Sequence, residues 1–252
     1  MSTALTAAAD APNVFQQVID AAIPIGHYKL HWLELLGVLI GIASAWYGMK
    51  RRVWAWPVGI VANVMLFFVY TAAAFGADSR VPLFGQAGRQ VFFILTSLYG
   101  WWRWSQLQRA TGDPQAPAVV PRWMTRRELL VVVSGWVVGT VVVQAVFGWL
   151  WNLAPNPFFT PAWWFYWCDA WIFVGSIVAT YAMARGWNEF WLAWIGVDIV
   201  GVPLLVHSGY IPTAVLYAFY AVFVVYGFIA WVRATRTEKP DREPEEAASA
   251  PA

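Results

Sequence analysis

The sequence has little charge: only 12% of its 252 residues are charged, whereas soluble domains carry about 25%. Its hydrophobic share of 60% and mean hydropathy of +0.54 represent more apolar surface than a soluble domain of this size can bury. This composition excludes a soluble enzyme, a nucleic-acid-binding protein and a disordered chain. A single cysteine, Cys168, excludes a disulfide-rich secreted protein. We therefore predict an integral membrane protein.

Motifs for catalysis and cofactor binding are also missing. The sequence contains no nucleophile–base pair, phosphate loop or nucleotide-binding motif, and its histidines are not spaced as metal ligands. A retinal photoreceptor needs a Schiff-base lysine in its last helix, but Lys29, Lys50 and Lys239 all lie outside the apolar stretches. We predict no enzymatic activity, no cofactor and no metal.

Seven stretches approach the length of about 20 apolar residues that a helix needs to cross a bilayer. Their continuous hydrophobicity favours helices over the alternating pattern of a membrane β-barrel. The predicted fold is therefore all-α, with seven transmembrane helices. The stretches are approximately Leu30–Met49, Val53–Phe75, Val81–Trp102, Leu129–Trp151, Ala162–Ala184, Phe190–Val206 and Tyr210–Val232.

Basic residues are concentrated in alternate loops, which hold 13 of the 16 lysines and arginines. The positive-inside rule then predicts a multi-pass protein of the inner (plasma) membrane, with its N-terminus outside and its C-terminus in the cytoplasm. Val14–Ile25, before the first span, is predicted as an interfacial helix or an unordered lead-in. The 13 residues are Lys50, Arg51, Arg52, Arg103, Arg109, Arg122, Arg126, Arg127, Arg185, Arg233, Arg236, Lys239 and Arg242.

The chain contains an internal repeat with offsets of 135 residues for the first two spans of each half and 127 for the third. The matched positions are Glu34 and Asp169, Trp56 and Trp191, Asn63 and Asp198, and Tyr99-Gly100-x-x-x-Trp104 and Tyr226-Gly227-x-x-x-Trp231. One linker helix between two triplets leaves both in the same orientation, which predicts a 3+1+3 parallel repeat with substrate held between the halves. The predicted segments are an extracytoplasmic lead-in (1–29), the first repeat (30–104), a cytoplasmic loop and linker helix (105–161), the second repeat (162–232) and a disordered cytoplasmic tail (233–252).

Ionisable residues inside spans mark candidate sites, because each costs about 2.5–3.5 kcal/mol on insertion scales. Asp198 lies well inside its span, and its i, i+3, i+7 spacing with Trp191 and Trp194 places all three on one helical face. Indole rings beside a carboxylate suit a flat heteroaromatic ligand, and the equivalent positions of the repeat complete the candidate site. The predicted substrate-binding residues are Trp191, Trp194, Asp198, Asn63, Gln90, Tyr217, Gln86, Tyr220, Trp56 and Gly59.

Structural roles remain open for these residues. The tryptophans suit an interfacial aromatic belt, and buried polar side chains also join helices without binding a ligand. Four further ionisable residues, Glu34, Arg89, Asp169 and Glu189, lie in or at the edge of a span. For Glu34 and Asp169 the alternative is that they reach water or cap a helix.

Five motifs together resemble the PnuC family of vitamin transporters over Trp32–Trp231. They are WAWPVGI (Trp54–Ile60), the Gln-rich start of the third span, YGWWRW (Tyr99–Trp104), NEFWLAWIGVD (Asn188–Asp198) and LY…YGFIAW (Leu216–Trp231). The resemblance implies a SWEET-like 3+1+3 fold and, often, a homotrimer. It also implies facilitated diffusion of a dephosphorylated vitamin, which a cytoplasmic kinase then traps.

Within that family the chain looks more like the riboflavin branch (PnuX/RibM-like). Its AWP and GRQ triplets depart from the pattern expected of nicotinamide riboside transporters. We therefore expect a riboflavin uniporter, with nicotinamide riboside as the alternative cargo. The expected partners are a small-molecule vitamin, the lipid bilayer and a vitamin kinase, with no nucleic acid.

Overall fold

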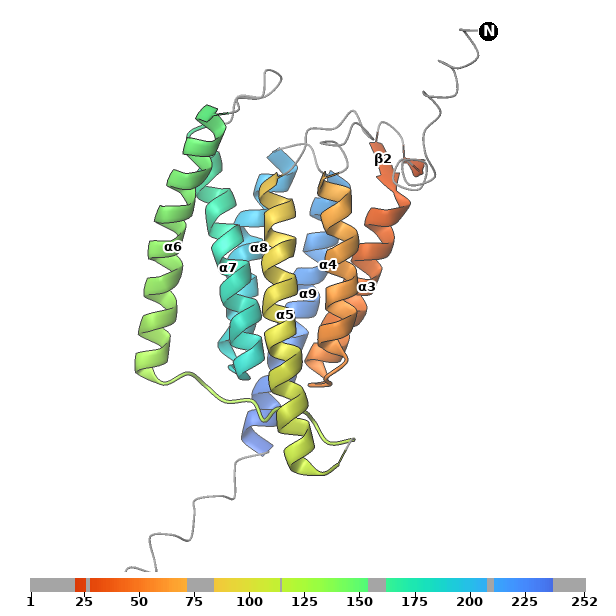
Figure 1. Cartoon of the computed structure of the whole chain (residues 1–252), viewed down its shortest axis with the longest axis vertical. Helices are drawn as coiled ribbons and strands as arrows, with labels where there is room; N and C mark the ends of the chain where they lie inside the picture. Colours follow the sequence, from red (N-terminus) through yellow and green to blue (C-terminus); the bar gives the residue numbers. More distant parts are fainter. Residues whose placement is uncertain are drawn as a thin grey trace, which may run out of the picture.

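The computed structural model describes residues 21–25, 28–71, 84–113, 115–153, 162–207 and 211–237. Within these residues the chain forms seven long helices that run side by side, in the order of the seven predicted apolar stretches (Figure 1). They are α3 (Trp32–Met49), α4 (Ala55–Thr71), α5 (Phe84–Thr111), α6 (Arg126–Leu153), α7 (Phe165–Arg185), α8 (Glu189–His207) and α9 (Ile211–Thr237).

The predicted ends of these helices hold to within a few residues, with two exceptions. Helix α5 continues to Thr111 instead of ending at Trp102, because the apolar stretch reports the thickness of a bilayer and not the full length of a helix. For the same reason α9 continues past Val232 to Thr237, so the predicted disordered tail (233–252) is helical over residues 233–237. The predicted end of the second span at Phe75 and start of the third at Val81 lie outside the described residues.

A short antiparallel hairpin precedes α3. Strand β1 (Ala22–Ile25) pairs with β2 (Tyr28–His31), with Ala22 opposite His31. The prediction of an interfacial helix or an unordered segment over Val14–Ile25 is therefore wrong for Ala22–Ile25, where Pro24 disfavours a helix interior. Residues 14–20 lie outside the described part, and the described fold is helical apart from this hairpin.

Four described helices contain stretches long and apolar enough to cross a membrane by length and composition, and α4 adds a shorter apolar stretch. Outward-facing side chains of α6 such as Leu130 and Val131 are 67% and 72% exposed, as expected of helices that face lipid. The four stretches are Trp32–Met49, Arg126–Leu150, Phe165–Arg185 and Tyr217–Thr237.

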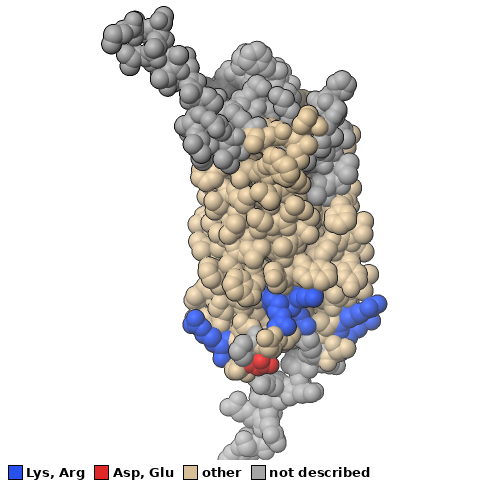
Figure 2. All heavy atoms as spheres, turned by 90° about the vertical axis from the view of Figure 1, so that its right-hand side faces the viewer, with Lys and Arg blue, Asp and Glu red and all other residues tan. Residues whose placement is uncertain are grey.

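Basic side chains gather at one end of the bundle, as Figure 2 shows for one face. This end, called the basic end below, holds the turn between α3 and α4, the end of α5, the start of α6, the turn between α7 and α8, and the end of α9 (Figure 1). Its described basic residues are Lys50, Arg51, Arg52, Arg103, Arg109, Arg122, Arg126, Arg127, Arg185, Arg233 and Arg236.

The helices pack mostly against their neighbours in sequence. Helix α4 lies between α3 and α5, α8 lies between α7 and α9, and α5 joins the two groups by packing on α7. Helix α6 packs on the outer side of α7, at the edge of the bundle (Figure 1).

Four buried tryptophans form the core at the basic end. Trp56 packs edge-on against Trp104, with ring centroids 5.2 Å apart, and Trp191 packs edge-on against Trp231 at 6.2 Å. Each partner indole then binds the other half of the bundle: Trp104 Nε1 donates to Ala184 O (3.2 Å) and Trp231 Nε1 donates to Met49 O (3.1 Å). These two hydrogen bonds join the end of α5 to that of α7 and the end of α9 to that of α3.

The segment before α6 crosses the basic end and contacts both helical turns there. In this linker strap (residues 115–125), Ala118 N donates to Arg51 O (2.8 Å) and Arg122 N donates to Gly186 O (3.0 Å). Arg51 and Gly186 both have positive φ, 55° and 75°, and they are related by the offset of 135 residues. One strap therefore binds two matching turns, in each case through the backbone carbonyl of the residue with positive φ.

Candidate functional site

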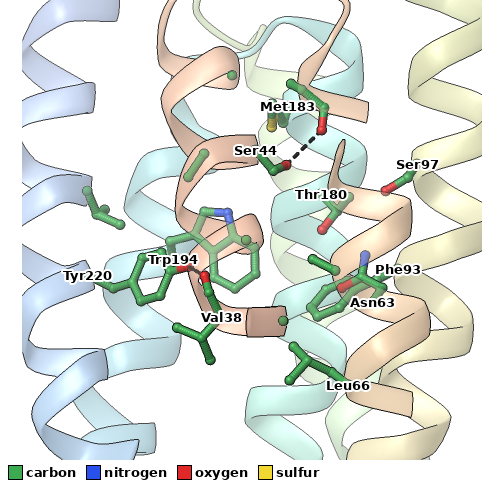
Figure 3. Close-up of a pocket in the computed structure, with 18 of the residues that line it drawn as sticks. Val38, Ser44, Asn63, Leu66, Phe93, Ser97, Thr180, Met183, Trp194 and Tyr220 are labelled. Carbon is green, nitrogen blue, oxygen red and sulfur yellow. Dashed lines mark hydrogen bonds between the residues drawn. The ribbon is translucent and has the colours of Figure 1, made fainter. Parts of the chain in front are cut away.

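A cavity of about 260 Å³ lies among the helices. Its described lining residues come from α3, α4, α5, α7, α8 and α9, whereas α6 contributes none of them. Figure 3 shows several of these side chains in place. The cavity is thus enclosed by two groups of three helices.

Trp56 and Trp191, which are 2% and 3% exposed, belong to the part of the wall that lies toward the basic end. Their rings lie flush against glycines: a Cβ on Gly100 would come within 2.5 Å of the Trp56 ring, and one on Gly227 within 2.3 Å of the Trp191 ring. Any side chain at these glycines would push the indoles aside. The close packing leaves Trp56 and Trp191 fixed at the edge of the cavity.

Trp194 provides the main aromatic surface of the cavity. Its ring lies 6.0 Å from that of Phe93, with 46° between the planes. In Figure 3 Trp194 is drawn between Tyr220 on one side and Phe93 and Asn63 on the other. Tyr220 Oη donates to Val38 O (3.4 Å), which joins α9 to α3 beside the cavity. A flat ligand would find aromatic faces here for offset or edge-on stacking.

Polar groups from four helices also face the cavity: Asn63, Gln90, Asp198 and Tyr217 all belong to its lining. Gln90 is 2% exposed, and its Oε1 has no hydrogen-bond partner among the described residues. The same holds for Nε1 of Trp56 and Trp191. Each of these three atoms exposes less than 1 Å², so a ligand or water would reach them only after neighbouring side chains move aside.

Ionisable side chains add charge to this wall. Glu34, Arg89 and Asp198 line the cavity, and Arg89 Nη2 donates to Tyr217 Oη (3.1 Å). Asp169 is outside the lining but interacts electrostatically with Arg89.

Glu189 has a structural role: its Oε1 accepts a hydrogen bond from Met124 N (2.9 Å), which ties α8 to the strap.

Nine of the ten predicted site residues line the cavity, and the tenth, Gln86, lies in α5 with a side chain outside the described part. Gly59 differs from expectation in one respect. The space left by its missing side chain is not open to a ligand, because a Cβ there would lie 2.8 Å from Ser44 Oγ. Ser44 in turn donates to Ala55 O (2.7 Å). Gly59 therefore lets α3 and α4 approach each other beside the cavity.

Other lining residues escaped the sequence analysis. The repeat drew attention to the second and third helices of each half, but Gly41, Ser44, Thr180 and Met183 belong to α3 and α7. They are small or flexible and carry no charge or ring that would single them out. Phe93 was also missed, although its position matches that of Tyr220 under the offset of 127.

A membrane-embedded helix bundle that encloses a polar and aromatic cavity is the architecture of a small-molecule transporter. The chain belongs to the nicotinamide mononucleotide transporter family, whose model matches residues 31–233. It is a vitamin transporter of the PnuC family, and its relatives are membrane transporters and not enzymes.

Two curated relatives and one solved structure are similar over most of the chain. The riboflavin/roseoflavin transporter RibM of Streptomyces davaonensis is 35% identical over 83% of this chain and 89% of its own. The nicotinamide riboside transporter PnuC of Escherichia coli is 26% identical over 87% and 94%. A crystal structure of the vitamin B3 transporter PnuC matches with a TM-score of 0.60, 23% identity and coverage of 82% and 83%, which supports the fold.

Proposed function

We propose that this protein takes up riboflavin by facilitated diffusion. The observation that carries the proposal is the 35% identity, over 83% of the chain, to a protein named as a riboflavin/roseoflavin transporter. Riboflavin is a flat, neutral tricyclic ring with a polyol tail. Its size and polarity require a cavity that combines aromatic faces with hydrogen-bonding groups.

The cavity chemistry supports this assignment. Trp194 and Phe93 offer ring faces to the isoalloxazine, and the Gln90 side chain adds an amide to the same lining. The Asn63 amide and the Tyr217 hydroxyl, also in the lining, can donate to or accept from the ring and the hydroxyl groups of the ligand. Together these groups supply both the donors and the acceptors that a flavin needs.

Nicotinamide riboside is the second candidate cargo. The carboxylates of Glu34 and Asp198 in the lining favour its cationic ring, and the E. coli relative carries that cargo in its name. Direct competition between the two vitamins for one binding site separates the candidates.

We infer that transport uses a SWEET-like 3+1+3 arrangement of parallel repeats, α3–α5 and α7–α9, that rock about the cargo. Repeated contacts support this. Gly48 and Met183 are related by the offset of 135 and face each other, since a Cβ on Gly48 would lie 2.5 Å from Met183 Cε. A residue that touches its own counterpart lies beside a pseudo-twofold axis.

The distribution of basic residues supports placing the basic end in the cytoplasm and the N-terminus outside the inner membrane. Uptake then delivers the vitamin to a cytoplasmic kinase, whose phosphorylation of the cargo prevents its return. A homotrimer is part of the same proposal, on the family resemblance. Nine of the ten predicted residues, including Gln86, are proposed to bind the substrate, while Gly59 shapes the wall by letting α3 and α4 approach each other.

The test is flavin binding and uptake by the purified protein in proteoliposomes. The expected result is saturable riboflavin binding, measured through quenching of flavin fluorescence. Absence of such binding would refute the proposal. Trp194→Ala should weaken binding by about 1–3 kcal/mol, as loss of base–aromatic stacking does. Trp149→Ala is the matched control, because Trp149 on α6 is 60% exposed and outside the cavity lining.

A further inference from the structure

Arg89 brings a buried positive charge to a cavity wall that also carries carboxylates. Its side chain is 5% exposed and lines the cavity with Glu34 and Asp198. It interacts electrostatically with Asp198 on α8 and with Asp169 on α7. The guanidinium is always protonated in proteins, so this wall keeps a fixed cation.

Neighbouring side chains hold the guanidinium at the edge of the aromatic surface. Its Nη2 donates to Tyr217 Oη at 3.1 Å, and the group lies 5.8 Å from the centroid of the Phe93 ring. Phe93 in turn packs beside Trp194. A ring bound against Trp194 would therefore lie close to the positive charge.

The charge occurs in only one half of the repeat. The offset of 127 that relates α5 to α9 places Leu216 at the position equivalent to Arg89. A ligand between the halves would thus meet a guanidinium on one side and no matching cation at the equivalent position. The arrangement makes the two halves of the cavity wall electrostatically unlike.

Fixed charge inside a protein acts strongly on a ligand, because a low dielectric and the absence of salt leave it little screened. A guanidinium attracts the carbonyl oxygens of a neutral ring and repels a ring that carries its own positive charge. We propose that Arg89 is a specificity-determining residue, which selects a neutral heteroaromatic cargo over a cationic one. The inference deepens the proposed riboflavin transport and rests on the same cavity.

The test compares ligands of nearly equal shape and different charge. Oxidised nicotinamide riboside is cationic and its reduced dihydro form is neutral, so their affinity ratio isolates the charge of the ring. Arg89→Gln should raise the affinity for the oxidised form relative to the reduced form by about tenfold, the size expected for a unit charge nearby at intermediate dielectric. Arg89→Lys keeps the charge and should leave the ratio near that of the unchanged protein.

Arg89→Met supplies a second test, because it removes the same positive charge and leaves an apolar side chain in its place. It should also raise the relative affinity for the oxidised form, and it keeps the inference testable should Arg89→Gln fail to fold in a thermal unfolding assay. A folded Arg89→Gln or Arg89→Met protein with an unchanged ratio would overturn the inference. Absence of riboflavin binding by the unchanged protein would refute the proposed cargo instead, while the two nicotinamide riboside forms still report on Arg89.

Discussion

At the basic end, α5 and α9 make equivalent hydrogen bonds to the other half of the bundle: Trp104 donates to Ala184 O and Trp231 donates to Met49 O. Along the cavity, by contrast, the two halves differ, since Trp194 corresponds to Gly59 under the offset of 135. Contacts that close the bundle are repeated, whereas cavity residues such as Trp194 and Gly59 differ between the halves. The comparison indicates that packing constrains both halves alike, whereas an asymmetric ligand requires unlike walls.

The largest effect should come from the paired glycines beneath the tryptophans. Gly100→Ala and Gly227→Ala each place a methyl group against a rigid buried indole, and such overpacking costs about 1–3 kcal/mol. Thermal unfolding in detergent should show both variants to be destabilised to a similar degree. Gly148→Ala on α6 is the control, since a Cβ there meets no atom within 4 Å. A loss of stability in only one of the two variants would show that the two halves are not packed alike.

The indole hydrogen bonds should show a smaller and unequal effect. Trp231→Phe and Trp104→Phe each remove one N–H donor, which costs about 1 kcal/mol or more when a buried carbonyl loses its partner. Ala184 O keeps a second donor, Arg103 Nε at 3.0 Å. We therefore expect Trp104→Phe to be the milder of the two in unfolding measurements. The reverse order would show that the ring packing, and not the hydrogen bond, dominates.

The smallest change in stability should come from the residues with positive φ in the α3–α4 turn and the α7–α8 turn. Arg51 has a positive φ that an L side chain rarely adopts, while Gly186 supplies the same conformation without strain. Arg51→Gly should therefore stabilise the protein by at most about 1 kcal/mol, because relief of the strain outweighs loss of the long hydrogen bond (3.4 Å) that Arg51 Nη1 donates to Val119 O. Gly186→Ala should destabilise it, because its Cβ would also lie 2.5 Å from Val119 Cγ2. Unfolding midpoints that shift in the same direction for both variants would contradict this account.

Much of the bundle could be predicted from sequence because apolar length and charge placement act locally. The seven helices and most of the site followed from such patterns, together with the offsets that pair Trp56 with Trp191 and Asn63 with Asp198. The hairpin at Ala22–Ile25 and Tyr28–His31 was missed, because pairing between two short strands leaves little trace in composition.

The contribution of α3 to the cavity could not be predicted for a related reason. Ser44 and Gly41 matter through what they permit in three dimensions: Ser44 Oγ fills the space at Gly59, and a Cβ on Gly41 would lie 3.2 Å from Tyr220 Oη. Small side chains carry no signal of their own until the neighbouring helix is known. Charged and aromatic residues, in contrast, are conspicuous in an apolar stretch.

The strap between the halves depends on main-chain atoms. Its donors, Ala118 N and Arg122 N, each directly follow a proline, Pro117 and Pro121, and proline keeps the residue before it extended. The exposed side chains of the segment are therefore free to vary over evolutionary time, whereas Ala118 and Val119 are buried in the core and neither donor position can become proline. Drift at the exposed positions would leave the joint between the halves intact.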